Sequence, residues 1–219
     1  MKRHIFILIN LAFYFGYSQT HKATYSLKVE ANPITGGTEL ADEINPLAED
    51  NEFYLYFDKT KSYYTSYNIE NNIRNSSDTY GMSFQPMLYN YFNKTFQQNV
   101  EIEKLYHFTY ENQTSWTVTN ESKIINGRTC FKANGILTDI IGDHIKFKIE
   151  AWFAPEINYP VGPGNYAGLR GIIVYLIFEN YIIFKLEKIK FNDNSIDLDK
   201  IQYEGEVLSK EKYIEYLKD

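Results

Sequence analysis

The residues with side chains suited to acid–base or metal chemistry are few and lie far apart in the sequence. Glu150 and Glu156 flank Trp152 and could act as an acid–base pair, but such carboxylates are more often surface ion-pair partners. Three histidines outside the N-terminal segment lack the paired spacing of metal ligands; they are His21, His107 and His144. We therefore predict no catalytic residue, no metal site and no cofactor. The alternative is a hydrolase-like enzyme that uses Glu150, Glu156 or a converging histidine.

Four glycines between residues 162 and 171 could form a phosphate-binding loop. Such a loop is followed by a helix whose backbone N–H groups point at the phosphate. Here residues 172–178 are β-branched and apolar, which predicts a strand. The segment therefore reads as a structural connection in which Pro160 and Pro163 restrict the backbone and the glycines allow tight turns or close backbone contact.

Aromatic side chains gather around the same segment. They could line a groove for an apolar or sugar-like ligand, because ligand pockets are largely apolar with a few polar groups. Any one of them could equally pack in the core. The candidate residues for binding a ligand or a partner are Trp152, Phe153, Tyr159, Tyr166 and Arg170.

Five blocks between residues 116 and 173 together have a distinctive order: residues 116–127, 130–133, 150–157, 162–163 and 166–173. On these blocks the sequence from 116 to 191 resembles the GLPGLI family of small exported Bacteroidota-type proteins. The signature positions are Gly162, Pro163, Gly168, Leu169, Gly171 and Ile172. Arg170 stands where the family has proline, which restores a backbone donor and weakens the case for a rigid family-wide site. The family has no settled biochemical activity, so the resemblance implies export without naming a reaction.

The elements that position these residues are mostly strands. Apolar and polar residues alternate in residues 23–29, 104–119 and 145–153, and the aromatic segment 53–57 pairs with 62–67 as a hairpin. Asn126 and Gly127 predict another hairpin turn, and residues 172–191 form a third. Residues 32–51 read as a long loop or a short irregular helix, and residues 68–99 as mostly loops, with a short helix among them as an alternative. The single cysteine, Cys130, is predicted to be buried as a small apolar residue.

The last residues change period, because Ser209 is placed as an N-cap before an amphipathic helix that ends near residue 217. Short strands joined by turns, without intervening helices, imply a mainly β protein. We predict a curved antiparallel sheet or incomplete β-barrel with a short C-terminal helix, with a two-sheet sandwich as the alternative.

The N-terminus predicts export. Lys2 and Arg3 precede an apolar stretch, residues 5–15, that is too short to span a bilayer, so residues 1–19 read as a signal peptide and residues 20–219 as one domain. We expect the periplasm, with outer-membrane association or secretion as alternatives. The net charge of −6 argues against a nucleic-acid partner, which would need a basic face.

Together these features predict a non-enzymatic envelope protein whose curved sheet binds an apolar ligand or another envelope protein. An accessory role in outer-membrane uptake or assembly is a further alternative. An open interior would favour carriage of a ligand, and a filled interior would favour interaction through the surface.

Overall fold

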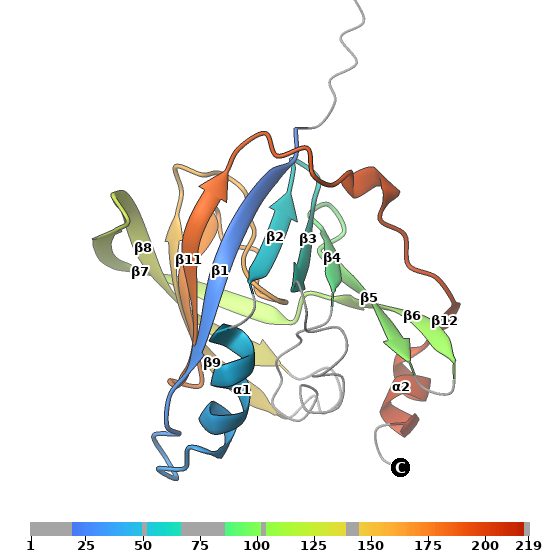
Figure 1. Cartoon of the computed structure of the whole chain (residues 1–219), viewed down its shortest axis with the longest axis horizontal. Coiled ribbons are helices and arrows are strands. Elements are labelled where there is room, and N and C mark those ends of the chain that lie inside the picture. Colours follow the sequence, from blue (N-terminus) through green and yellow to red (C-terminus); the bar gives the residue numbers. More distant parts are fainter. Residues whose placement is uncertain (1–18, 50–51, 67–85, 102–103, 139–144, 217–219) are drawn as a thin grey trace, which may run out of the picture.

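The computed structural model describes residues 19–49, 52–66, 86–101, 104–138 and 145–216. The predicted signal peptide therefore lies outside the described residues except for Gln19. One sheet of 12 strands dominates the fold, in the order β12-β6-β5-β4-β3-β2-β1-β11-β10-β9-β8-β7 (Figure 1). Every neighbouring pair is antiparallel except β12 and β6. The prediction of a mainly β, open antiparallel sheet is confirmed.

The strands run as follows: β1 (His21–Val29), β2 (Phe53–Phe57), β3 (Lys61–Ser66), β4 (Met87–Asn90), β5 (Thr95–Glu101), β6 (Leu105–Glu111), β7 (Thr114–Ile125), β8 (Arg128–Thr138), β9 (Lys146–Ala154), β10 (Ile172–Phe178), β11 (Ile182–Lys190) and β12 (Glu206–Leu208). The prediction of mostly loops in residues 68–99 is wrong for its last part, which contains β4 and most of β5. Residues 67–85 lie outside the described residues.

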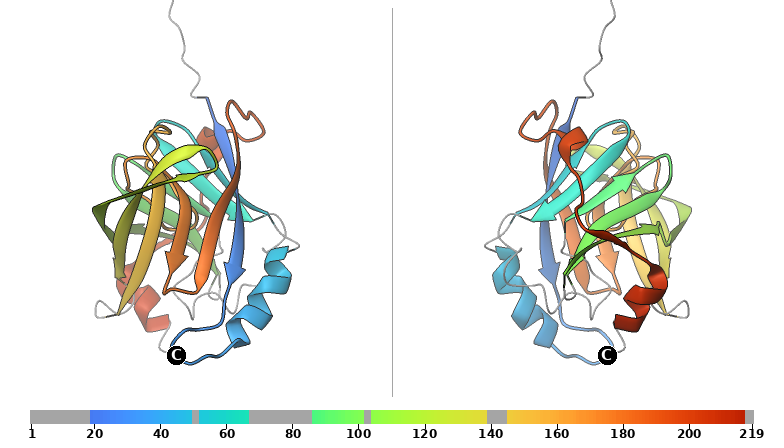
Figure 2. Two further views of the ribbon diagram at one scale, coloured as in Figure 1. Left: turned by 90° about the vertical axis from the view of Figure 1, so that its left-hand side faces the viewer. Right: turned by 90° about the vertical axis from the view of Figure 1, so that its right-hand side faces the viewer.

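The sheet has an inner face that carries the core and an opposite, outer face. In β1 the inner face consists of Ala23, Tyr25, Leu27 and Val29, each at most 7% exposed. The intervening side chains, from Lys22 to Lys28, point to the outer face, as the alternation of a strand requires. The sheet wraps partly around the interior (Figure 2).

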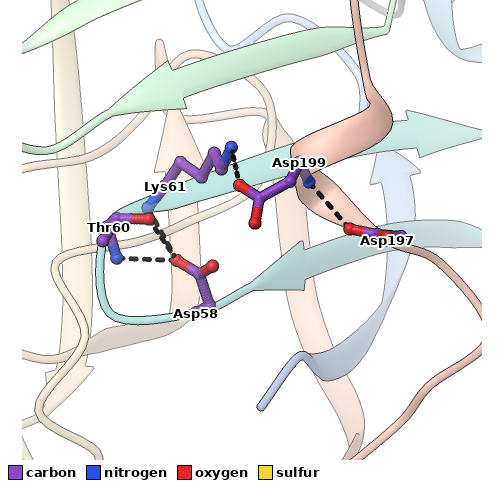
Figure 3. A network of polar contacts seen from close by, with 5 residues as sticks. All are labelled: Asp58, Thr60, Lys61, Asp197 and Asp199. Carbon is purple, nitrogen blue, oxygen red and sulfur yellow. Dashed lines mark hydrogen bonds and ion pairs between the residues drawn. The ribbon is translucent and has the colours of Figure 1, made fainter. Parts of the chain in front are cut away.

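Turn chemistry fixes two of the hairpins. Asn126 and Gly127 join β7 to β8 with φ of 49° and 76°, so the predicted turn is confirmed. Between β2 and β3 the Asp58 carboxylate accepts hydrogen bonds from the Thr60 N–H at 2.6 Å and the Lys61 N–H at 2.9 Å (Figure 3). This Asx-type turn confirms the predicted hairpin there.

Two helices lie beside the sheet. α1 (Glu39–Glu49) is a regular helix that continues through Pro46, so the expectation of a loop or irregular helix is only partly right. Its Ile44 is 2% exposed, and the Asn45 side chain bonds both the N–H and the carbonyl of Val29 at 2.8 Å. These contacts attach the helix to the edge of β1 where β2 has ended.

The C-terminal helix α2 (Lys210–Tyr216) is confirmed. Ser209 Oγ accepts a hydrogen bond from the Lys212 N–H at 3.2 Å, as an N-cap does. Tyr213 packs on Phe108 of β6 with ring centres 4.7 Å apart. The helix therefore covers the sheet near β12, at the end opposite β7.

A strap, residues 191–205, leads from β11 to β12 and contains the short helix η3 (Leu198–Lys200). Lys61 and Asp199 form an ion pair at 2.6 Å, which ties η3 to β3 (Figure 3). Farther on, Tyr203 stacks on the ring of His107. The strap thus covers the outer face of β3 and β6.

Candidate binding surfaces

The connector, residues 155–171 between β9 and β10, folds back over the inner face of the sheet. Val161, Tyr166 and Leu169 are at most 3% exposed and belong to the same core cluster as the inner side chains of β1 and β11. The Tyr166 ring centre lies 6.1 Å from that of Phe178 and 6.4 Å from that of Phe184. The connector therefore contributes core side chains rather than the wall of an open groove.

Two signature glycines of the connector lie where a side chain would collide. A Cβ at Gly162 would be 2.4 Å from the Tyr166 carbonyl oxygen and 2.6 Å from Ile173 Cδ1. At Gly171, φ is 153° and a Cβ would be 2.5 Å from the Ala154 carbonyl oxygen. Close approach to backbone atoms is thus the reason for glycine at both positions, which was predicted for Gly171. Strand β10 begins at Ile172, directly after Gly171, so no helix N-terminus faces the glycines.

The remaining signature residues serve the same packing. Pro163 is buried, and Leu169 and Ile172 are 3% and 0% exposed. Gly168 has φ of 104°, and its N–H donates to the Pro160 carbonyl at 3.0 Å. The signature residues therefore determine how the connector folds and packs.

Trp152 lies on the outer face and its indole is covered. It is 7% exposed, and its Nε1–H donates to Glu150 Oε1 at 3.0 Å. The Lys123 ammonium stands 3.8 Å from the ring centre, within cation–π distance. Lys132 pairs with Glu150 at 3.0 Å. Trp152 is thus enclosed by charged side chains of β7, β8 and β9.

The other candidate residues point elsewhere. Phe153 faces the inner side, 5% exposed and 6.3 Å from the Phe131 ring. Tyr159 lies at the end of the sheet near His21, and Arg170 is exposed to solvent. Trp152, Phe153, Tyr159, Tyr166 and Arg170 therefore do not line one common groove.

A polar link at His21 was missed by the sequence reasoning, which considered the histidines only as metal ligands or as a converging catalytic group. The backbone N–H of Asn192 donates to His21 Nδ1 at 3.1 Å, so Nε2 carries the proton and donates to the Tyr159 hydroxyl at 2.8 Å. Burial lowers the pKa of His21 below its usual 6.5, and the charge of Asp58 opposes this only in part. The neutral ring joins the start of β1, the end of β11 and the connector.

The groups proposed for chemistry are held by separate partners. Glu150 bonds Trp152 and Lys132, whereas Glu156 pairs with Arg128 at 3.2 Å. Within the described ranges, no group of three or more His, Cys, Asp or Glu side chains could hold a metal ion. His144 lies outside these ranges. The thiol of Cys130 is buried, as predicted.

Comparison with known proteins informs the fold only. No protein-family model matches the chain, and no curated protein matches it. The fold resembles that of PNGF-II. Its structure in the P21 space group has a TM-score of 0.60 at 16% identity over 91% of this chain, and the C2 form has 0.57 at 15% over 90%.

This chain spans 33% of the PNGF-II chain, so the likeness covers about a third of that protein. At such identity the similarity concerns the arrangement of strands and carries no activity across. Membership of the GLPGLI family stays a prediction. In the part of the chain that the structure describes, no helix has the length and apolar character needed to cross a membrane.

One surface feature was not singled out from the sequence. The tip of the β7–β8 hairpin bends toward β11, where the Asn126 side chain donates to the Leu186 carbonyl at 3.2 Å, and the hairpin carries exposed apolar side chains. Val118, Ile124 and Phe131 are 55%, 67% and 37% exposed. The alternating, apolar-rich arms around Asn126 and Gly127 were visible in the sequence, but alternation does not say which of their apolar side chains stay exposed, because Cys130 of the same hairpin is buried in the core.

Proposed function

We propose that this protein is an exported, non-enzymatic envelope protein that binds another envelope protein through its surface. The observation that carries the proposal is the buried connector. Because Val161, Tyr166 and Leu169 occupy the inner face, the side that would have received an apolar ligand is taken up by the chain itself. Recognition through an exposed surface is therefore favoured over carriage.

The β7–β8 hairpin is the surface best suited to a protein partner. The register places Val118 opposite Ala133, Phe131 opposite Ser122 and Ile124 opposite Thr129, so the three apolar side chains share one side of the hairpin. β7 is also the last strand of the sheet, and within the described residues one of its edges has no neighbouring strand. Exposed apolar side chains beside a free strand edge are what a partner protein can cover by strand addition.

The predicted signal peptide supports the envelope as the compartment, with the periplasm as the first expectation. An accessory role in uptake or assembly at the outer membrane is compatible with such binding. The hydrolase alternative gains no support from the geometry, because Glu150 and Glu156 form ion pairs with different cations.

Retention of envelope proteins on the immobilised protein tests this proposal. A variant with Val118→Ser, Ile124→Ser and Phe131→Ser should lose the retained partner, because its apolar contact area is removed. Ile34→Ser is the matched control, since Ile34 is 87% exposed but lies in a loop before α1. Equal retention by the triple variant and the control would reject the hairpin as the binding surface.

A further inference from the structure

Lysines are concentrated on the outer face of six adjacent strands, from β7 to β1 and β11. The strand register places each of them on this side of the sheet, together with Trp152 and Tyr175. The nine residues are Lys22, Lys28, Lys123, Lys132, Lys146, Lys148, Lys185, Lys188 and Lys190. We name this surface the lysine face.

The lysine face has an excess of positive charge although the whole chain carries a net −6. Five carboxylates lie within ion-pair distance of its lysines: Glu30, Glu121, Glu150, Glu187 and Asp193. The nine lysines therefore outnumber these carboxylates by four. Exposed pairs such as Lys28–Glu30 and Lys185–Glu187 contribute little stability, so these lysines can exchange partners at small cost.

Acidic residues gather elsewhere in the molecule. α1 alone contains Glu39, Asp42, Glu43 and Glu49 and no basic residue. The strap covers the outer face beyond β2, through Lys61–Asp199 and Tyr203, and does not reach β1 and β9 to β11, although Lys123 and Asn126 of the β7–β8 hairpin lie over part of β9 to β11. These four strands lie side by side in the left view of Figure 2.

The lysines are spread in two dimensions. From β9 to β1 the face is three strand spacings wide, about 14 Å, and Lys22 to Lys28 extends about 20 Å along β1. One extended chain of an acidic polymer is about as wide as a single strand and would leave most of these lysines unused. A planar array of negative charges would engage many of them at once.

We propose that the lysine face docks this protein peripherally on a membrane surface rich in anionic lipid headgroups. The ammonium groups supply the attraction, and the half-buried, amphipathic ring of Tyr175 lies among them, with the Lys123 ammonium 5.6 Å from its centre. This surface is distinct from the β7–β8 apolar side chains, which lie on the opposite side of the sheet.

Sedimentation with lipid vesicles tests the proposal on the purified protein. Binding is expected to vesicles that contain about 30% phosphatidylglycerol, to be absent with phosphatidylcholine alone, and to fall steeply as salt screens the charges. Replacing Lys185, Lys188 and Lys190 by glutamate should weaken binding at least about 100-fold, since each lysine near an anionic surface contributes about fivefold.

The matched control replaces Lys59, Lys94 and Lys200, three exposed lysines away from this face, by glutamate. It changes the net charge equally and should retain most of the binding. Equal loss in both variants would mean that only net charge matters and would overturn the proposal. So would absence of binding to anionic vesicles, or retention on a soluble polyanion such as dextran sulfate without vesicle binding. The Val118, Ile124 and Phe131 serine variant should bind vesicles normally, which separates this test from that of the partner surface.

Discussion

Tyr166 is the residue at which the buried connector can be tested most sharply, because its ring and its hydroxyl make opposite contributions. The side chain is 1% exposed, among the aromatic rings of Phe178 and Phe184. Removing the ring in Tyr166→Ala leaves a cavity and should lower the free energy of unfolding by about 3–5 kcal/mol. A typical domain has a free energy of unfolding of about 5–15 kcal/mol, so this loss would be a large part of the total stability.

The hydroxyl of Tyr166 is buried and has no hydrogen-bond partner among the residues that the structure describes, and burial raises its pKa far above 10. Tyr166→Phe removes the cost of burying that group and should change stability by less than about 0.5 kcal/mol or increase it. Tyr25→Phe is the control, because the Tyr25 hydroxyl donates to the Ile173 carbonyl at 2.7 Å. Its loss should cost about 1–3 kcal/mol, since a buried carbonyl loses its partner.

Equilibrium unfolding in urea, followed by fluorescence, measures all three variants against the unmodified protein. Two outcomes would refute the reasoning. A loss below about 1 kcal/mol for Tyr166→Ala would show that the connector is loosely packed. A larger loss for Tyr166→Phe than for Tyr25→Phe would show that the Tyr166 hydroxyl has a partner.

Three further predictions concern the same framework. Gly162→Ala should destabilise the protein by more than about 2 kcal/mol, because the added Cβ would collide with a carbonyl oxygen. Gly36→Ala should cost only about 1 kcal/mol, because the space around Gly36 is open, and thermal unfolding compares the two variants. Because the pKa of His21 is lowered in the folded state, the neutral ring's contribution to stability is present above pH 6.5 and is lost as pH falls through the folded pKa. His21→Asn should therefore flatten this part of the curve of unfolding free energy against pH, and an unchanged slope would contradict the prediction. Hydrogen bonds from Ser195 lower the pKa of Asp193 to about 2, so the contribution of its carboxylate to stability is present above pH 3.8 and is lost as pH falls toward 2. NMR titration should find this low pKa, and Ser195→Ala should raise it.

The sequence predicted those features that depend on local pattern. Alternation in residues 23–29 gave β1 and its faces, and Asn126 with Gly127 gave a hairpin, because both signals act between neighbouring residues. Ser209 likewise marked the start of α2. The strand β4 was missed because it has only four residues, and β5 because Phe96 and Val100 are its only apolar residues, so neither shows a clear alternation.

The candidate binding residues could not be placed from sequence, because their positions depend on long-range packing. Trp152 and Phe153 are adjacent and therefore point to opposite faces, and Tyr166 became a core residue only because the connector folds over the inner face. The net charge of the chain did not predict the charge of the lysine face, for a related reason. A chain with net charge −6 still forms the lysine face, because register decides which side chains share a surface.

Photo-crosslinking in intact cells is the measurement that most directly separates a surface-binding protein from a ligand carrier. A photoreactive phenylalanine analogue at Ile124, on the exposed side of the β7–β8 hairpin, should yield one major protein adduct, and the same analogue at Ile34 should yield none. Equal adducts from both positions, or none at Ile124 while an apolar small molecule copurifies in stoichiometric amount, would contradict binding through the hairpin.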